Sequence, residues 1–174
     1  KEALQNLKPY EATEIRDLNI DYERLDEAVS GLKDFNVLFV ELGSETDFLV
    51  MTGRIDLLAN AIDHIQEKFG YCTILGVHHA GSTIPILEES KIEFGSYVTP
   101  INKLGVMMFP NMNATLEAIK RSEKPITATK PLAGGRIRPG NALRYVYQEL
   151  GVLFCMIGVG SESEAEEDFS IALE

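Results

Sequence analysis

The chain has 174 residues, 45% of them hydrophobic, which is enough apolar surface to bury a core. Its formal net charge of −11 repels nucleic acids and anionic membranes, so we expect neither partner, and a phosphate ligand would need a local basic site. No apolar run approaches the roughly 20 residues of a membrane span, and residues 1–20 lack a secretory signal, so a cytoplasmic location is expected.

The N-terminal segment is predicted to form a helix over Lys1–Lys8 and then a short strand over Ile15–Ile20. From Asp21 onward, short apolar runs alternate with amphipathic stretches, a pattern typical of repeated βα units. Asp21 is placed to cap the first amphipathic helix, whose apolar stripe is spread over Leu25–Leu32.

Five runs rich in β-branched and aromatic residues are predicted to be the main strands, and their continuous apolarity indicates cover on both faces of a sheet. Cys72 and Cys155 both fall in such runs, so we expect them to be buried, reduced thiols. The five runs are Val37–Leu42, Cys72–His78, Tyr97–Ile101, Ile126–Lys130 and Val152–Val159.

The intervening helices carry recognisable end signals. Gly70 is expected to end a helix whose stripe extends over Leu58–Phe69, and Pro139 suits the first turn of a later helix. Ser161 with Glu164 has the pattern of a capping box. The helix that it opens is predicted to be striped by four apolar residues, Ala165, Phe169, Ala172 and Leu173.

These elements predict an α/β fold and, within that class, a parallel (β/α)8 barrel of the TIM type, in one domain over residues 1–174. About six strands are indicated where a closed barrel needs eight, so the chain is expected to lack its first one or two βα units. A fragment, further strands upstream of Lys1, or a barrel built from two chains would each explain the shortfall. An open sheet edge would also suit pairing in a homo-oligomer.

A phosphate-binding turn is predicted where the fourth main strand ends. In the segment ITATKPLAGGRIRPG, Gly134 and Gly135 let backbone N–H groups approach an anion, and Arg136 adds a charged donor. The next unit repeats the arrangement with Gly160 and Ser161, and the loops after the last two strands of a barrel commonly form a phosphate site. The alternative is that these glycines only permit tight turns between strand and helix.

Chemically reactive side chains also follow the predicted strands. His78 ends the second run beside His79, and strand alternation points one of the two histidines into the barrel mouth. Glu41 ends the first run, with Glu45 and Asp47 in the loop beyond it, so a carboxylate could face His78 or share a metal ion with it. The alternatives are a structural histidine and solvated acids.

Two further side chains are candidates at this mouth. Lys130 ends the fourth run, where a buried lysine could act as an amine nucleophile in Schiff-base chemistry, although a lysine there more often pairs with a carboxylate. Asn102 follows the third run and could hydrogen-bond a cofactor amide or an oxyanion, unless it serves ordinary turn formation.

From about Asp21 to Glu174 the chain resembles the aldo-keto reductase superfamily. The segments that carry the resemblance are YCTILGVHHAG, YVTPIN, ATKPLAGGRI and MIGVGSESEAEEDF, in that order. The resemblance implies a barrel that binds NAD or NADP across its C-terminal mouth and reduces carbonyl groups. It also implies that Gly134, Gly135, Arg136, Gly160 and Ser161 contact the cofactor.

The chain departs from that family in its catalytic set of Asp, Tyr, Lys and His. The Asp and Tyr would lie upstream of Lys1, Arg16 stands where the lysine is expected, and Glu41 or Gly43 replaces the histidine. The pair that would hold the nicotinamide amide is His78-His79, and Val98 replaces a glutamine. Four acidic residues would repel the extra phosphate of NADP, namely Glu162, Glu164, Glu166 and Glu167.

The leading hypothesis is a divergent aldo-keto reductase-like protein that binds a phosphate-bearing small molecule or a nicotinamide cofactor. If it is an oxidoreductase, His78 or a residue upstream of Lys1 must supply the proton. A second hypothesis is a lyase, an isomerase or a metal-assisted hydrolase that uses Glu41, His78, Asn102 and Lys130. A third is a non-catalytic barrel kept for binding or assembly.

Overall fold

The computed structural model describes residues 9–43 and 45–173. Its centre is a five-stranded sheet in which every neighbouring pair is parallel and the strand order follows the chain, β1-β2-β3-β4-β5. The parallel α/β fold is therefore confirmed, and the sheet is open, with β1 and β5 at its edges. The strands are β1 (Phe39–Leu42), β2 (Cys72–Gly76), β3 (Tyr97–Pro100), β4 (Ile126–Thr129) and β5 (Phe154–Cys155).

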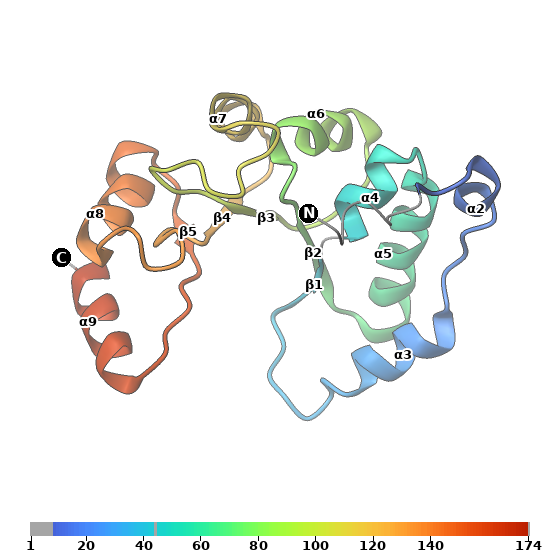
Figure 1. The fold of residues 1–174 in the computed structure, drawn as a ribbon. Coiled ribbons are helices and arrows are strands. Elements are labelled where there is room, and N and C mark those ends of the chain that lie inside the picture. Colours follow the sequence, from blue (N-terminus) through green and yellow to red (C-terminus); the bar gives the residue numbers. More distant parts are fainter. Residues whose placement is uncertain (1–8, 44, 174) are drawn as a thin grey trace.

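Helices lie along the outer side of the curved sheet, and the molecule has the shape of an arch in Figure 1. None of the helices in the described part of the chain is long and apolar enough to cross a membrane. In chain order they are α2 (Ala12–Arg16), α3 (Tyr22–Ser30), α4 (Glu45–Met51), α5 (Ile55–Phe69), α6 (Ala80–Ser90), α7 (Met112–Arg121), α8 (Pro139–Arg144), the π-helical turn η1 (Tyr145–Glu149) and α9 (Glu162–Ala172).

The end signals of the helices form as the sequence predicted. The Asp21 side chain accepts a hydrogen bond from Arg24 N at 3.0 Å at the start of α3. Gly70 ends α5 with φ of 73°, in the left-handed region that glycine adopts without steric strain. Pro139 occupies the first turn of α8. These local signals are confirmed because each depends on neighbours only a few residues away.

The main core lies between the sheet and its helices. Leu42, Leu75, Tyr97 and Ile126 form one row across four paired strands, and this row packs against buried side chains of α5 and α6. Leu75 and Tyr97 are fully buried. Full burial of an aliphatic or aromatic side chain contributes about 1.5–3 kcal/mol, so this row and its helical partners hold the arch together.

The opposite face of the sheet is concave, and no described helix covers it (Figure 1). Its row runs through Gly76, Val98, Thr127 and Phe154, which are paired across β2 to β5. Burial falls off along this row, because Val98 is 3% exposed whereas Phe154, on the edge strand, is 56% exposed. The prediction that the strands are covered on both faces is therefore wrong for β5, which has a neighbour on one side only.

Two further predictions about the edges of the sheet are wrong, and a third cannot be compared with the described residues. The strand expected over Ile15–Ile20 is replaced in part by α2, because a reciprocal capping box between Glu11 and Glu14 starts a helix there. The last strand is Phe154–Cys155 and not Val152–Val159, since β4 is its only partner in the described sheet. The helix expected over Lys1–Lys8 lies outside the described residues.

Burial also differs from expectation at particular side chains. Cys72 is exposed, because it is the first residue of β2. Cys155 is partly buried, and burial raises the pKa of its thiol to about 11. On α9, Phe169 is 59% exposed and Leu173 is 90% exposed, so the predicted stripe does not face the core. The buried position of this helix is Asp168 instead.

Candidate functional site

The loop after β4 is a tight turn that the chain closes with its own hydrogen bonds. Ala133 N donates to Lys130 O at 3.0 Å. The backbone φ angle is positive at four residues of the turn, including 68° at Gly134 and 78° at Gly135. Within the described residues, the N–H groups of these two glycines make no hydrogen bond. Both remain available to an anion, as in other backbone nests.

Arg136 folds back over this turn. Its Nη1 donates to Ala133 O at 2.6 Å, which holds the guanidinium against the glycines. A Cβ atom added at Gly134 would lie 2.9 Å from that Nη1. Glycine is therefore favoured at position 134 by the backbone angle, and a larger residue would also displace the flexible end of Arg136. Arg136 as a whole is exposed, and N–H donors other than the one bonded to Ala133 O remain on its guanidinium.

The loop after β5 also contains glycines, but the N–H group of one of them already has an acceptor within the chain. Gly160 N donates to Glu164 Oε2 at 2.7 Å, and Ser161 Oγ accepts from Glu164 N at 3.2 Å. The Ser161 half of the predicted capping box forms, whereas the Glu164 carboxylate accepts from Gly160 N and not from Ser161 N, so the reciprocal half differs from the prediction. The Glu164 carboxylate lies where an anionic ligand of this turn would lie. The turn thus binds an anion that belongs to the chain itself.

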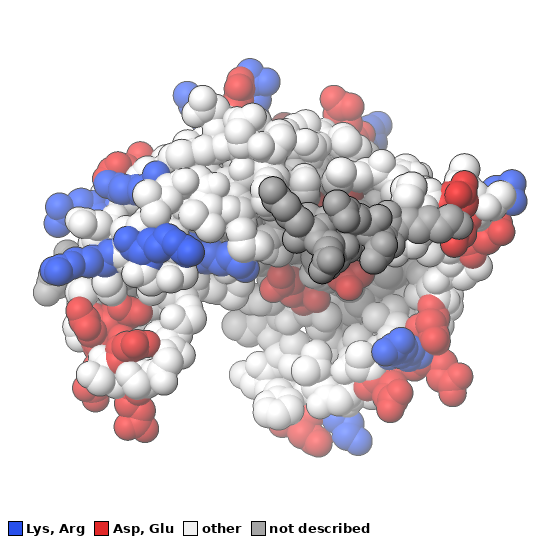
Figure 2. Space-filling model, in the orientation of Figure 1, with Lys and Arg blue, Asp and Glu red and all other residues white. Residues whose placement is uncertain are grey.

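A cavity of about 740 Å³ lies between the two loops, at the carboxyl ends of β4 and β5. One wall contains the basic side chains Lys130, Arg136 and Arg138, all exposed. The other wall comes from α9 and is acidic. In Figure 2 a band of basic side chains lies over the α8 end of the molecule, directly above the acidic side chains of α9. Gly134, Gly135 and Gly158 also line the cavity, whereas Gly160 and Ser161 do not.

The acidic wall consists of Glu164, Glu167 and Asp168. Asp168 is 4% exposed, and burial raises the pKa of its carboxyl group, with further contributions from the charges of Glu167 and Glu164. Within the described residues, no ion pair joins this wall to the basic wall. The cavity therefore keeps two charged surfaces of opposite sign apart.

Asn102 is placed next to the cavity, but its side chain is engaged in the loop after β3. Its amide nitrogen donates to the carbonyl oxygens of Val106 and Lys130, and its amide oxygen accepts from the N–H groups of Leu104 and Val106. The residue is 1% exposed. Asn102 thus joins the β3 loop to the start of the glycine turn, and all four of its hydrogen-bonding positions are already used.

A second group of reactive side chains lies on the concave face beside the cavity. Glu41 covers Gly76, where an added Cβ atom would lie 2.5 Å from Glu41 Oε1. The pKa of His78 is lowered, first by burial and then by the charge of Lys130, while the charges of Asp47 and Glu41 oppose this shift. The structure therefore brings Glu41 and Lys130 within electrostatic range of His78. Lys130 belongs to both groups.

Asp47 positions the two histidines. Its buried carboxylate accepts from His78 N at 2.7 Å, from His79 N at 3.1 Å and from Thr83 Oγ1 at 2.6 Å. The His79 ring stacks on Phe109 with centroids 4.9 Å apart. Asp47 was expected in a loop, and that is wrong, because α4 begins at Glu45 and carries it inward.

Lys130, the candidate amine nucleophile, follows the last residue of β4. Lys130 is exposed, so the burial that would favour an amine nucleophile is absent, because its side chain extends from a turn with φ of 54° at the rim. In residues 9–43 and 45–173, no group of three His, Cys, Asp or Glu side chains is arranged to hold a metal ion. A metal-assisted reaction therefore has no ligand set in this part of the chain.

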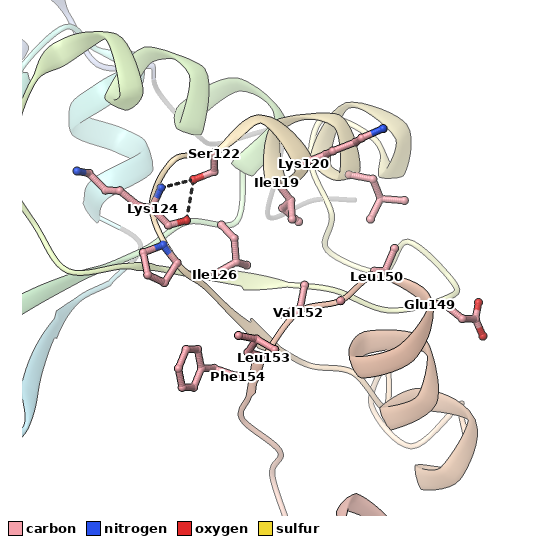
Figure 3. Close-up of a pocket in the computed structure, with 13 residues that line it drawn as sticks. Ile119, Lys120, Ser122, Lys124, Ile126, Glu149, Leu150, Val152, Leu153 and Phe154 are labelled. Carbon is pink, nitrogen blue, oxygen red and sulfur yellow. Dashed lines mark hydrogen bonds between the residues drawn. The ribbon is translucent and has the colours of Figure 1, made fainter.

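Another cavity, of about 660 Å³, lies between α7, the start of β4 and the segment before β5. In Figure 3 its walls are mostly apolar, and the ammonium groups of Lys120 and Lys124 point away from Leu150 and Val152. The Lys124 ammonium lies 4.7 Å from the Phe94 ring centroid, and Ser122 Oγ hydrogen-bonds the Lys124 backbone. This cavity has no converging polar groups, so the cavity beside the glycine turn is the better candidate.

Sequence reasoning singled out Gly134, Gly135 and Arg136 and also the acidic residues Glu164 and Glu167, but it missed Asp168. Asp168 was passed over because the apolar residues of α9 were expected to face inward. The signal that could have found it is the spacing of Glu164 and Asp168, which are four residues apart and so share one face of a helix. Comparison of the chain with family models, with curated proteins and with solved structures finds no match.

Proposed function

We propose that the cavity between the β4 and β5 loops binds a small molecule through a phosphate group. The observation that carries this proposal is the pair of N–H groups at Gly134 and Gly135 that have no acceptor among the described residues, beside three basic side chains, in a chain of net charge −11. The strand ends of parallel sheets are the usual place for such ligands. A local basic site in an acidic protein is also the arrangement that a phosphate ligand would need.

The proposal includes the finer architecture. We take the open sheet to be part of a (β/α) barrel of the TIM type, which is supported by its parallel strands in chain order, its curvature and the helices along its outer side. In a barrel the cavity would lie at the C-terminal mouth. The concave face with Glu41 and His78 would then line the interior near that mouth.

The resemblance to aldo-keto reductases makes a nicotinamide dinucleotide the first ligand to test. The glycine turn fits one phosphate of its diphosphate, while Glu164 already occupies the Gly160 N–H group, so a second phosphate would depend on Arg138 or Lys130. The acidic residues of α9 favour NAD over NADP, because the extra phosphate of NADP would approach like charges.

His78 is the residue that would handle the proton in such an oxidoreductase. Its lowered pKa keeps the imidazole neutral at pH 7, which suits a base that accepts the hydroxyl proton of an alcohol. A bound oxidised nicotinamide would supply the acceptor for the hydride that leaves the alcohol carbon as the carbonyl forms. Glu41 would stabilise the imidazolium, and Asp47 holds the histidine backbone in place.

The test is titration of the protein with NADH and NADPH, followed by nicotinamide fluorescence, and with inorganic phosphate and pyrophosphate, followed by calorimetry. We expect Arg138→Ala to weaken binding about tenfold, because it removes a charged donor. Arg144→Ala, an exposed arginine of α8 outside this cavity, is the matched control and should bind like the wild type. Absence of phosphate or pyrophosphate binding would overturn the proposal, and absence of a fluorescence change alone would overturn its nicotinamide part.

A lyase or isomerase is the second candidate, because the charges of Lys130 and Glu41 both act on His78. A carbonyl substrate held by the phosphate site would lie near the Lys130 amine. Borohydride reduction in the presence of small phosphorylated aldehydes and ketones should then produce a stable adduct that is lost in Lys130→Ala. A panel that leaves the wild-type mass unchanged would exclude the Schiff-base version.

A further inference from the structure

The acidic wall of the cavity holds a carboxylate whose partner is missing. Asp168 is 4% exposed and lines the cavity, and its side chain makes no hydrogen bond or ion pair in the described part of the chain. Its carboxylate oxygens are not among the fully enclosed atoms that lack a partner, so they keep contact with the solvent in the cavity. Burying a carboxylate without a partner is costly, so buried charged groups are normally paired or hydrogen-bonded. The nearest charges given by the chain itself, Glu167 and Glu164, are of the same sign.

In the described part of the chain, the basic side chains of the cavity do not pair with Asp168. Lys130, Arg136 and Arg138 line the opposite side of the same cavity, and among the described residues none of them forms an ion pair with α9. Arg136 is directed instead to Ala133 O. Metal ions are a poor answer, because the described residues contain no group of three ligands suited to one. The space between the walls remains for a ligand that presents charge of both signs.

We propose that the ligand is a phosphate ester that also carries an amine, with the phosphate at the Gly134–Gly135 turn and the ammonium group at Asp168 and Glu167. This inference rests on the phosphate part of the proposed function and not on its nicotinamide part. An ammonium group has donors for two carboxylates at once and restores charge balance on the buried wall. A phosphate without an amine leaves Asp168 unpaired and lies opposite three acidic side chains, so its affinity is lower.

The experiment compares aminoalkyl phosphates of increasing chain length, beginning with O-phosphoethanolamine, with the alkyl phosphates of equal length. Binding to the whole chain is measured by calorimetry. We expect the best aminoalkyl phosphate to bind about tenfold more tightly than its alkyl counterpart, because a charge-assisted hydrogen bond is gained. Equal binding of the two series by the wild type would overturn this inference while leaving the phosphate proposal intact. Binding of neither series would overturn both.

Variants of the acidic wall test whether its carboxylates cause the preference for the amine. Asp168→Asn should abolish the preference for the amine and leave alkyl phosphates bound as tightly or more tightly, while Arg138→Ala weakens both series. Glu162→Gln is the matched control, since Glu162 lies in the first turn of the same helix but outside the cavity, and it should keep the preference. Circular dichroism checks folding. If Asp168→Asn is unfolded, Glu167→Gln is tested in its place. An unchanged preference for the amine in a folded variant of either residue would contradict the placement of the ammonium group at the acidic wall.

Discussion

Two glycine turns follow neighbouring parallel strands, and they differ in what meets their backbone N–H groups. In the part of the chain that the structure describes, the turn after β4 leaves the N–H groups of Gly134 and Gly135 without an acceptor, next to basic side chains. The turn after β5 has its Gly160 N–H bonded to Glu164, and its Ser161 hydroxyl accepts from the same residue. The comparison teaches that a glycine-rich turn is an anion site only where no nearby carboxylate already fills it.

The largest expected effect on stability comes from the difference in backbone φ angle between glycines of the two turns. Gly134→Ala places a side chain at φ of 68° and 2.9 Å from the Arg136 guanidinium, so we expect a loss of about 1–2 kcal/mol and a melting temperature lower by roughly 3–6 °C. Gly158→Ala is the control, because its added Cβ has nothing within 4 Å and its φ is not positive. Calorimetry measures the melting temperatures of both variants. Equal values for Gly134→Ala and Gly158→Ala would contradict the expected difference between the two positions.

A smaller effect is expected from opening the second turn. Glu164→Ala removes the acceptor of the Gly160 N–H, which should lower the melting temperature by about 2–4 °C. The same change should tighten phosphate binding in the cavity several-fold, since it removes the negative charge of Glu164 from the cavity wall. Glu162→Ala, with the same change of net charge, should leave phosphate affinity nearly unchanged. Weaker binding in Glu164→Ala would refute the idea that the carboxylate takes the anion's place.

The acidic wall supplies a pH test with a defined sign. The pKa of Asp168 is raised in the folded chain, so the folded state holds its proton more tightly and ionisation at neutral pH opposes folding. Asp168→Asn should therefore raise the melting temperature at pH 7 by about 1–3 °C, and this gain should shrink as the pH falls towards the ordinary carboxyl range near 3.9. A melting temperature that Asp168→Asn lowers at pH 7, with a loss that shrinks on acidification, would show that the carboxylate has a stabilising partner.

The smallest effect links the first turn to the histidine of the concave face. Removing the Lys130 charge in Lys130→Met should raise the pKa of His78, because that charge disfavours the imidazolium. The pKa should stay below its ordinary value, since burial is the larger cause. Histidine proton signals followed by NMR against pH would measure it. Lys103→Met, which removes a lysine paired with Glu149, should leave the His78 titration unchanged.

Local signals in the sequence predicted much of the fold and half of the site. The centres of β1 to β4, the cap at Asp21 and the left-handed Gly70 all form where expected, because each depends on short-range hydrogen bonds or backbone sterics. The glycine turn after β4 could be predicted for the same reason. Predictions failed at the sheet edges, where Ile15–Ile20 is not a strand.

Arg54 shows why that segment was beyond sequence reasoning. Its Nη1 donates to the carbonyl oxygens of Ile15, Arg16 and Leu18 at 2.7–3.1 Å, across more than 30 residues of chain. Those carbonyl groups are bonded by a distant guanidinium and need no neighbouring strand. No periodicity within residues 15–20 contains this information, because the partner begins a different helix.

By itself the sequence determined the alternation of strands and helices, the helix ends and the glycine turn that can hold an anion. Only the tertiary structure decided which charges meet at that turn, because α9 packs with Asp168 inward and Phe169 outward, against its own apolar pattern. It also decided that Glu164 closes one turn while the other stays open. Local conformation follows from steric and hydrogen-bonding preferences within a few residues, whereas burial and electrostatic pairing depend on segments that approach only when the chain folds.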